Sequence, residues 1–456
     1  MWHAASVSVD RAALLDRFRR IRARTRALFD LIDEAAYYRR PIPLRNPIVF
    51  DEGHLPAFAV NTFVKRGLGR PGVDERLEEI FARGIDPESE AASIARGNPA
   101  WPARKAVQAY AAAADEAIQD AIAAAEIERP GHPLLDRSEA LWAILEHEEM
   151  HQETLAYLWH RLPYELKRKP EHYVTLPQRL TTGTSVSSPI PIPAGTVTMG
   201  TGYDDGPFAW DNERPPHQMP VEAFHIDLHN VTNAEFEEFV KAGGYRSAAW
   251  WRPEDWAWIR AERVLHPRFW QLEDGRWFWR GMFDVVPLPD AWPVYVSWAE
   301  AQAYARWRGA RLPTEAEFHR AAFGALDGPD RRFPWGNAVR PAESGRVPGN
   351  FDFVRWDPDP VGAHPEAASA FGVHDLVGNG WEWTSSVFAP FDGFAPTPSY
   401  PEYSADFFDG RHFVLKGASP VTSRTLVRRG FRNWFRPHYP FVYASFRCVT
   451  GSVHSS

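Results

Sequence analysis

The sequence predicts an α+β protein in which an N-terminal four-helix bundle is followed by a domain of short strands and loops. Three observations lead to this prediction. Residues 10 to about 165 carry apolar side chains at helical spacing. Beyond residue 190 the apolar runs are short and lie between loops rich in Gly, Pro and Asp. The chain has 456 residues, which is more than one ordinary hydrophobic core organises, so two domains are expected.

Four segments of the N-terminal half have the pattern of amphipathic helices. Residues 9–38 place an apolar stripe opposite a row of arginines, and the stripe consists of Leu14, Phe18, Ile21, Thr25, Leu28 and Ile32. The other three segments are residues 50–67, 103–125 and 137–162. Such helices predict an up-and-down bundle, in which metal sites form from inward side chains on facing helices.

The C-terminal half has a different composition. Residues 176–189 are rich in Thr, Ser, Gly and Pro and are predicted as a linker, which gives domains of residues 1–175 and 190–456. Most of the 20 tryptophans lie after residue 200, so aromatic packing is expected to hold the second domain together. Its short strands are expected in "GTVTMG" (195–200), "HQMPVEAFHIDLHNVT" (217–232) and "HFVLKGAS" (412–419).

Composition and charge narrow the classes of function. The formal net charge of −8 argues against nucleic acid as the main partner. The N-terminus has no apolar signal region, and no run of roughly 18 apolar residues occurs, so neither secretion nor a membrane span is expected. Cys448 is the only cysteine, which excludes an intramolecular disulfide and predicts a cytoplasmic protein.

The segment "ILEHEEMHQETL" (144–155) carries two histidines four positions apart. His147 and His151 therefore lie on one face of the predicted helix, close enough for one metal ion to bind both. His54, at the start of the second predicted helix, is a candidate third ligand from a facing element. Three imidazoles on one side leave the opposite coordination positions open, which suits an iron ion that must hold substrate and oxygen together.

Two other interpretations of these histidines stay open at this point. The same residues fit the H-E-x-x-H pattern of zinc peptidases, with Glu148 as general base and Glu171 as third ligand. The context of Glu171, "KRKPEHYV", is basic and follows a proline, which is more typical of a loop that leaves the bundle. In the second interpretation the histidines are unrelated, one buried and one solvated, and His54 faces solvent at a helix start.

At this point the sequence resembles a known family. The pairing of "DEGH" (51–54) with "EHEEMHQETL" (146–155) is similar to the DinB-like helical domain of the ergothioneine-type sulfoxide synthases. The C-terminal half resembles the formylglycine-generating-enzyme fold, a C-type-lectin-like domain. The motifs of this second resemblance are "IPAGTVTMG" (192–200), "VTNAEFEEFV" (231–240), "RLPTEAEF" (311–318), "FPWGN" (333–337), "GVHDLVGNGWEWT" (372–384) and "SFRCV" (445–449).

The cysteine count separates this chain from the enzymes for which the second fold is named. Formylglycine generation resembles copper chemistry on a pair of cysteines, and this chain has only Cys448, in a predicted final strand. The second domain is therefore not expected to carry out that chemistry. The resemblance to the sulfoxide synthases implies instead that it forms the substrate wall over the iron site.

The resemblance implies an enzyme that binds Fe2+ through His54, His147 and His151 and uses O2 as co-substrate. The implied reaction joins a sulfur or selenium donor to C2 of the imidazole of hercynine, the trimethylated betaine of histidine. Small molecules are thus the expected partners, with no nucleic acid and no membrane.

The stretch "RGFRNWFRPHYPF" (429–441) matches the betaine-binding segment of the family and indicates Asn433, Trp434 and Phe435. A quaternary ammonium forms no hydrogen bonds, so aromatic faces are its natural partners through cation–π attraction. Asn433 could orient the carboxylate. An aromatic core strand is the alternative interpretation of this stretch.

The match also has departures. Many family members carry glutamine directly before the third ligand, where this chain has Met150. The paired tyrosines that some members place between the second and third helices are missing, so Tyr400 and Tyr403 in "SYPEYSADFF" (399–408) are the candidate proton donors. The basic residues that bind γ-glutamylcysteine in some members have no clean counterpart, although Arg83 and Arg96 are near in sequence.

Residues 53–87 most resemble the selenoneine synthase branch, which uses a selenosugar as donor. The alternative is a sulfoxide synthase that uses γ-glutamylcysteine or cysteine. A non-catalytic binding module is a third class, because lectin-like domains often only bind, but it leaves the three histidines without a role. In "GNGWE" (378–382), Asn379, Glu382 and backbone carbonyls are candidate ligands of a structural Ca2+, as in related folds.

Overall fold

The computed structural model describes residues 10–82, 100–171, 173, 188–203, 205–338 and 348–451. The chain forms two compact units. Unit 1 comprises Met1–Glu171 and Thr397–Pro401, and unit 2 comprises His172–Pro396 and Glu402–Ser456. Most of the predicted linker, residues 176–189, lies outside the described ranges.

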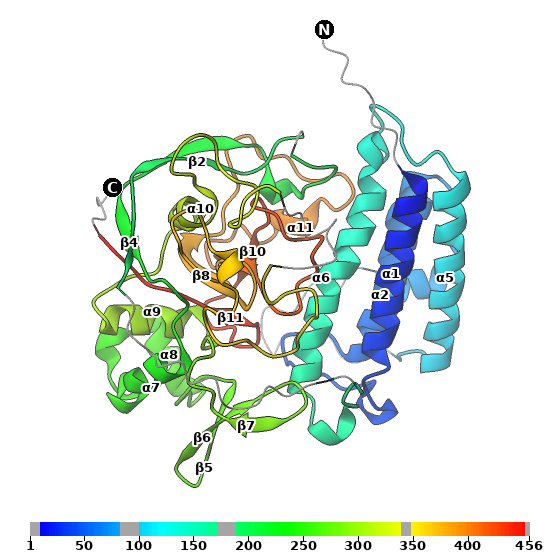
Figure 1. Cartoon of the computed structure of the whole chain (residues 1–456). Coiled ribbons are helices and arrows are strands. Elements are labelled where there is room, and N and C mark those ends of the chain that lie inside the picture. The colour runs from blue at the N-terminus through cyan, green and yellow to red at the C-terminus, as the bar shows by residue number, and fades with distance from the viewer. Residues whose placement is uncertain are drawn as a thin grey trace. The chain divides into compact units, whose positions relative to one another are not determined.

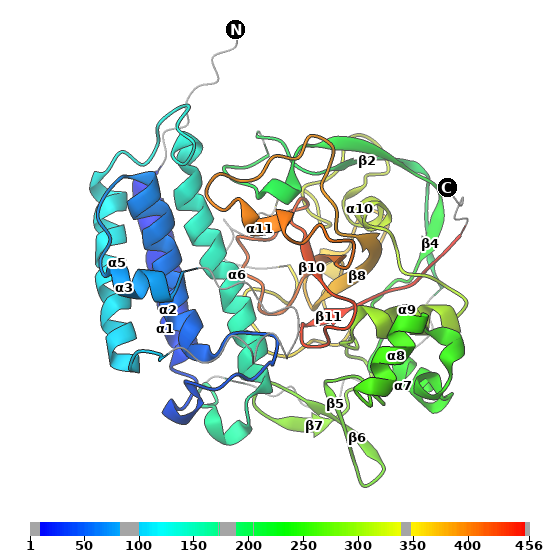
Figure 2. The same cartoon turned by 180° about the vertical axis from the view of Figure 1, so that it is seen from behind.

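Within its described residues, unit 1 is a bundle of four main helices that lie side by side in Figures 1 and 2. They are α1 (Arg11–Phe29), α2 (Ile48–Ala59), α5 (Arg104–Ala124) and α6 (Glu139–Arg161). The shorter elements of this unit are α3 (Glu75–Ile80), η1 (Glu34–Ala36), η2 (Val60–Gly67), η3 (Asp136–Ser138) and η4 (Tyr164–Leu166). The predicted bundle is confirmed.

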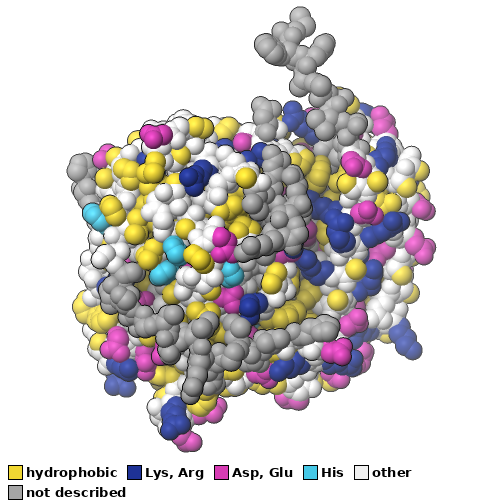
Figure 3. Space-filling view, viewed as in Figure 1, with side chains coloured by type: hydrophobic (Ala, Val, Ile, Leu, Met, Phe, Trp, Pro, Cys, Tyr) yellow, Lys and Arg dark blue, Asp and Glu magenta, His cyan; other side chains and the backbone are white. Residues whose placement is uncertain are grey.

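Helix α1 begins where a polar side chain can cap it. The Asp10 carboxylate accepts a hydrogen bond from the amide of Ala13, which satisfies one of the free N–H groups of the first turn. All five members of the predicted stripe that lie in the helix are buried, while Arg19 and Arg20 on the other side are exposed. In Figure 3, basic and acidic side chains both lie on the surface of this unit. The helix ends at Phe29 with Asp30 as its C-cap, before the end of the segment predicted from periodicity, and Asp33 then caps the separate short turn η1.

Helix α2 is almost wholly buried and contains Pro56. Proline has no N–H, so one backbone hydrogen bond of the helix is missing at this residue. One turn later the chain continues in the wider π-helical turns of η2, an irregularity that is frequent near functional sites.

Unit 2 contains short strands in four sheets among its described residues. The sheet orders are β1-β4-β12, β10-β9-β8-β11, β2-β3 and β5-β6-β7. The pairs are antiparallel except β11 with β8. The strands are β1 (Ile190–Ile192), β2 (Gly195–Met199), β3 (His217–Val221), β4 (Phe224–Ile226), β5 (Trp270–Glu273), β6 (Arg276–Arg280), β7 (Val285–Pro287), β8 (Gly380–Val387), β9 (Phe413–Ala418), β10 (Asn433–Phe435), β11 (Ala444–Ser445) and β12 (Val449–Thr450).

Three helices of unit 2 begin with reciprocal capping boxes. Their bounds are α7 (Asn233–Lys241), α9 (Trp298–Trp307) and α10 (Glu315–Phe323). In each, the hydroxyl of the Ser or Thr before the helix accepts a hydrogen bond from the backbone amide of the third helical residue, a Glu. The side chain of this Glu accepts a hydrogen bond from the backbone amide of the Ser or Thr, so two otherwise free N–H groups are satisfied. The helices α8 (Pro253–Ala261) and α11 (Glu402–Ala405) and the turns η5 (Asp211–Glu213), η6 (Gly244–Arg246), η7 (Ala248–Trp250) and η8 (Pro365–Ala367) complete the unit.

Aromatic side chains fill the interior of unit 2, as the composition predicted. Trp381 and Trp383 on β8 are at most 1% exposed. The predicted strands in residues 195–200, 217–232 and 412–419 are present as β2, β3 with β4, and β9. The final strand begins at Val449, so Cys448 lies directly before it rather than inside it, buried, with its amide bonded to Asp227. None of the described helices has both the length and the apolar character that crossing a membrane requires.

Candidate metal centre

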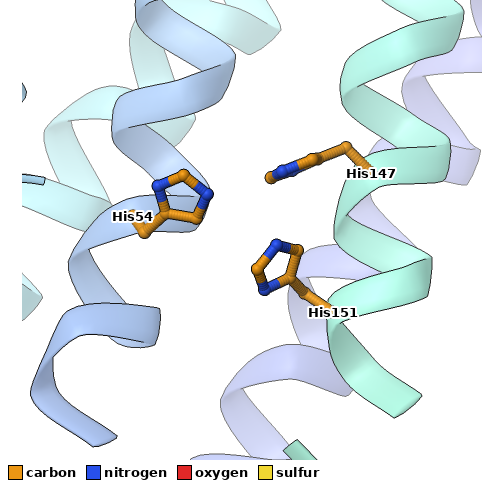
Figure 4. A group of neighbouring side chains, drawn as sticks. All are labelled: His54, His147 and His151. Atoms are coloured by element: carbon orange, nitrogen blue, oxygen red, sulfur yellow. The ribbon is translucent and has the colours of Figure 1, made fainter. Parts of the chain in front are cut away.

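Three histidines converge inside unit 1. His54 lies in the second turn of α2, and His147 and His151 lie one turn apart on α6. Their ligating nitrogens are all within 4.8 Å of one another, and Figure 4 shows the rings pointing toward one another from the two helices. In the described part of the chain, this is the group of His, Cys, Asp or Glu side chains that could hold a metal ion. The structure thus brings together the three residues that the sequence singled out.

His54 is held in one tautomer and one orientation. Its Nδ1 lies 2.9 Å from the carbonyl oxygen of Phe81, and since a carbonyl only accepts, Nδ1 carries the proton and Nε2 keeps its lone pair. The ring of Phe50 stacks on the imidazole with centroids 4.8 Å apart. Burial lowers the pKa of His54 to about 3, and the neighbouring His151 acts in the same direction. The imidazole is therefore neutral, as a metal ligand must be.

His147 is oriented by packing. The ring of Phe58 stacks face to face on it at a centroid distance of 3.7 Å. Burial, with the adjacent His151 and His54, holds the pKa of His147 well below its ordinary value. The imidazole that the sequence could not distinguish from a solvated histidine is 3% exposed and uncharged.

His151 has a carboxylate behind it. Its Nδ1 lies 3.3 Å from Oδ1 of Asp51, although the two are not aligned as a hydrogen bond. Asp51 is 5% exposed and precedes His54 by one helical turn. A carboxylate on the outer nitrogen of an imidazole is the usual partner of a metal-bound histidine. The sequence analysis missed Asp51, which its spacing of three residues from His54 could have indicated.

The donor set fits a divalent transition-metal ion. Imidazole nitrogens suit iron, zinc, copper and nickel, and a set of three on one side resembles sites with open positions for reactants. One ligand would come from α2 and two from α6, with the outer nitrogens of His54 and His151 directed at Phe81 and Asp51. These features agree with the expected Fe2+ site.

Glu148 lies on another face of α6 and is engaged elsewhere. Its Oε1 accepts hydrogen bonds from Arg22 at 2.8 Å and from Thr25 at 2.5 Å, and Arg22 also pairs with Asp115 at 2.6 Å. All of these groups are buried. The carboxylate therefore does not have the position that the general base of a zinc peptidase needs. Glu171, the third ligand of that alternative, is exposed at the end of unit 1 and outside the histidine group.

Comparison with known proteins gives the family. Residues 17–155 match the DinB superfamily, and residues 175–451 match the Sulfatase-modifying factor enzyme 1-like domain. Hercynine oxygenase of Mycolicibacterium thermoresistibile is 33% identical over 458 residues, covering 96% of this chain and 94% of that protein. Hercynine oxygenase of Mycobacterium tuberculosis is 33% identical over 451 residues, covering 94% and 96%. Ergothioneine biosynthesis protein 1 of Schizosaccharomyces pombe is 27% identical over 457 residues, covering 92% of this chain and 53% of that protein.

This chain belongs to the ergothioneine-type sulfoxide synthase family. The predicted order of a DinB-like helical domain before a formylglycine-generating-enzyme-like domain is confirmed, and so is the α+β fold class. The names of these relatives, hercynine oxygenase and ergothioneine biosynthesis protein 1, support an oxygenase rather than the binding-module alternative.

One of the two candidate proton donors lies at the histidine group. Tyr400 belongs to the segment Thr397–Pro401 of unit 1, and its ring centroid is 5.1 Å from that of Phe58 and 6.0 Å from that of His147. Tyr403 belongs to unit 2, where its ring stacks on Trp210 at 4.1 Å. Tyr400 is therefore the candidate that lies beside a histidine of the group within unit 1, and the role of proton donor stays a prediction for both tyrosines.

The predicted betaine-binding residues form β10, at the edge of its sheet in unit 2. Asn433, Trp434 and Phe435 are all partly exposed. One face of Trp434 is covered by Phe388 at 4.2 Å, and the ring of Phe435 stacks on Tyr439 at 5.0 Å. Trp434 also contacts the rings of Tyr403 at 5.3 Å and Phe407 at 5.5 Å, so much of its surface is engaged within unit 2, and the betaine-binding role of β10 stays a prediction.

The structure tests none of the roles predicted for Met150, Arg83 and Arg96. Met150 lies on α6 directly before His151 and is partly buried. Arg83 and Arg96 lie outside the described residues. The roles predicted for these three residues stay predictions.

The candidate calcium ligands are already used within the fold. Both carboxylate oxygens of Glu382 accept hydrogen bonds from Arg447 at 2.7 Å, and both side chains are fully buried. Oδ1 of Asn379 accepts from the amide of Asp359 at 2.7 Å and from Asn350 at 3.2 Å. These contacts give the carboxylate of Glu382 a role in neutralising a buried guanidinium, and the Ca2+ site expected on these two side chains and backbone carbonyls stays a prediction.

Proposed function

We propose that this protein is a non-heme iron, O2-dependent enzyme that joins a selenium donor, a selenosugar, to C2 of the hercynine imidazole. The observation that carries the proposal is the group formed by the buried His54 and His147 and the partly exposed His151, in a chain that is one third identical, over nearly its whole length, to proteins named hercynine oxygenase. Fe2+ bound to these imidazoles would supply the redox chemistry that the reaction with O2 needs.

The residues around the histidines prepare the site for that ion. Burial keeps His54 and His147 uncharged, so protons do not compete with the metal for their lone pairs. Phe50 and Phe58 cover the two rings and limit the access of bulk water. Asp51 favours the His151 tautomer whose Nδ1 carries the proton.

We assign the proton donor of the reaction to Tyr400, supported by its distance from His147. For the quaternary ammonium of hercynine we propose the partly exposed rings of Trp434 and Phe435, with Asn433 as partner of the carboxylate. These assignments rest on the family match and on side-chain chemistry.

The choice of donor rests on two features of unit 1. Residues 53–87 resemble the selenoneine synthase branch, and Met150 presents a polarizable thioether where a hydrogen-bonding glutamine is common in the family. Thiolates and selenolates both suit iron, so the metal alone does not select between them.

A competition assay tests the proposal. Iron-loaded protein is given O2, hercynine and equal concentrations of a selenosugar, γ-glutamylcysteine and cysteine, and the products are read by mass spectrometry. We expect the selenosugar to be consumed first, with a new C–Se bond at the imidazole C2. Preference for γ-glutamylcysteine would place the protein in the ergothioneine branch, and no reaction with hercynine would refute both forms of the proposal.

A further inference from the structure

The segment Thr397–Pro401 belongs to unit 1, although the chain before and after it belongs to unit 2. Two side chains of the helical unit bind the backbone of this segment. Arg66 donates from Nη1 to the carbonyl of Ser399 at 3.1 Å and from Nη2 to the carbonyl of Pro398 at 2.9 Å. Oε1 of Glu139 accepts from the amide of Ser399 at 3.3 Å and from its hydroxyl at 3.2 Å.

Both of these side chains come from the elements that carry the histidines. Arg66 lies in η2, the direct continuation of α2 beyond His54. Glu139 is the first residue of α6, about two turns before His147. The two helical elements that carry the histidines therefore also bind the segment Thr397–Pro401. Arg66 binds it with a positively charged side chain, and Glu139 binds it with a negatively charged one.

Ser399 needs these partners because its side chain and backbone are withdrawn from water. The residue is 0% exposed. A buried amide, carbonyl or hydroxyl without a partner costs roughly as much as a lost hydrogen bond, and bonds to charged groups are the stronger kind. The guanidinium fork also fixes direction, since it bonds two successive carbonyls at once.

The residue after Ser399 is Tyr400, whose ring lies beside Phe58 and His147. Consecutive Cα atoms are about 3.8 Å apart, so the position of Ser399 largely determines where this ring begins. A displacement of about 1 Å is enough to lower a rate roughly a hundredfold where a reacting group must be aligned.

We propose that Arg66 and Glu139 are positioning residues that hold Tyr400 beside the metal centre by binding the backbone of Pro398 and Ser399. The consequence for turnover rests on the proposed function, because it requires Tyr400 to act in the reaction. The positioning itself is independent of the substrate and of the metal.

Hydrogen–deuterium exchange on the metal-free, full-length protein tests the positioning. In Arg66→Ala and Glu139→Ala we expect the amides of Thr397, Ser399 and Tyr400 to exchange roughly tenfold faster or more. Arg66→Lys keeps the charge but cannot form the fork, so an intermediate rate is expected. Arg70→Ala removes an exposed arginine that follows η2 and should leave the segment unchanged. Unchanged exchange in Arg66→Ala and Glu139→Ala would overturn the proposal.

Turnover gives a second readout. Arg66→Ala should lower kcat for hercynine by roughly tenfold to a hundredfold, with iron content and helix content preserved. In a Tyr400→Phe background the same substitution should cause no further loss, because the residue acts through the tyrosine. Additive losses would refute the link to Tyr400. If the unchanged protein does not turn over hercynine, the proposed function fails while the exchange result still decides the positioning.

Discussion

Arg22 on α1 donates a hydrogen bond of 2.8 Å to Glu148, the residue that directly follows His147 on α6. The pair is buried, and Asp115 on α5 also bonds to Arg22. One charged group thus joins three helices of the bundle directly behind the metal centre. The glutamate of the H-E-x-x-H pattern has a structural role here.

This pair gives the first prediction. Glu148→Ala leaves Arg22 short of a partner in the interior, and removing one member of a buried ion pair typically lowers the free energy of unfolding by about 3–5 kcal/mol. Denaturant titration followed by circular dichroism measures the loss. Glu171→Ala, an exposed control, should change stability by less than about 0.5 kcal/mol. A stable Glu148→Ala protein that has lost all activity would indicate a direct chemical role for the carboxylate.

The second prediction concerns the histidines. His147→Ala or His151→Ala should abolish iron binding and turnover while the helical circular dichroism signal persists, because each substitution removes one of three ligating nitrogens within 4.8 Å. Metal analysis of the purified variants measures the bound iron. Glu171→Gln serves as a control and should keep both iron and activity. Full iron occupancy in His54→Ala would remove His54 from the ligand set.

The third prediction concerns the carboxylate behind His151. Asp51→Asn keeps the shape of the side chain but removes its charge, and loss of such an outer partner typically lowers metal affinity about tenfold to a hundredfold. Competition with a chelator measures the affinity. Glu52→Gln is the matched control, because Glu52 contacts Arg104 and Gln108 instead of the histidines. Equal iron affinities of the two variants would contradict a role for Asp51.

The fourth prediction is a pH dependence in unit 2. The hydrogen bond to Asp359, 2.9 Å from His364 Nε2, raises the pKa of His364 above its ordinary value of 6.5. Because the folded protein binds the proton more tightly than the unfolded chain, the stabilisation is fully present below pH 6.5. It is lost as the pH rises through the folded-state pKa. His364→Gln should therefore destabilise the protein more at pH 5.5 than at pH 9. Thermal unfolding at the two pH values measures the difference, and an equal loss of stability at both would contradict the prediction.

The sequence predicted the features that depend on local periodicity. The apolar stripe of α1 and the pairing of His147 with His151 follow from helical spacing alone. The length of α1 did not follow from periodicity, because the helix ends at the C-cap Asp30 although the apolar spacing continues to Ile32. Helical periodicity predicts which side chains share one face of a helix. It predicts the residue at which the helix ends less well.

Contacts between distant residues account for what the sequence did not predict. Arg447 lies 65 positions after Glu382, and nothing in "GNGWE" shows that this arginine would occupy both carboxylate oxygens. The proximity of Tyr400 to His147 likewise depends on a segment far along the chain, and only the family match indicated that tyrosine. Which side chains pair in the folded interior depends on the tertiary structure. Residue type and spacing along the chain determine these pairs only in part.

The return of the chain into unit 1 at Thr397–Pro401 limits how this protein can be divided or recombined. A fragment that ends at Glu171 retains all three histidines and lacks Tyr400. If the helical half were exchanged between relatives, Arg66 and Glu139 would come from one protein. The backbone of Ser399, which they bind, would come from the other. The two halves are therefore expected to be inherited together, and chimeras should function only when residues 397–401 are exchanged along with the helices.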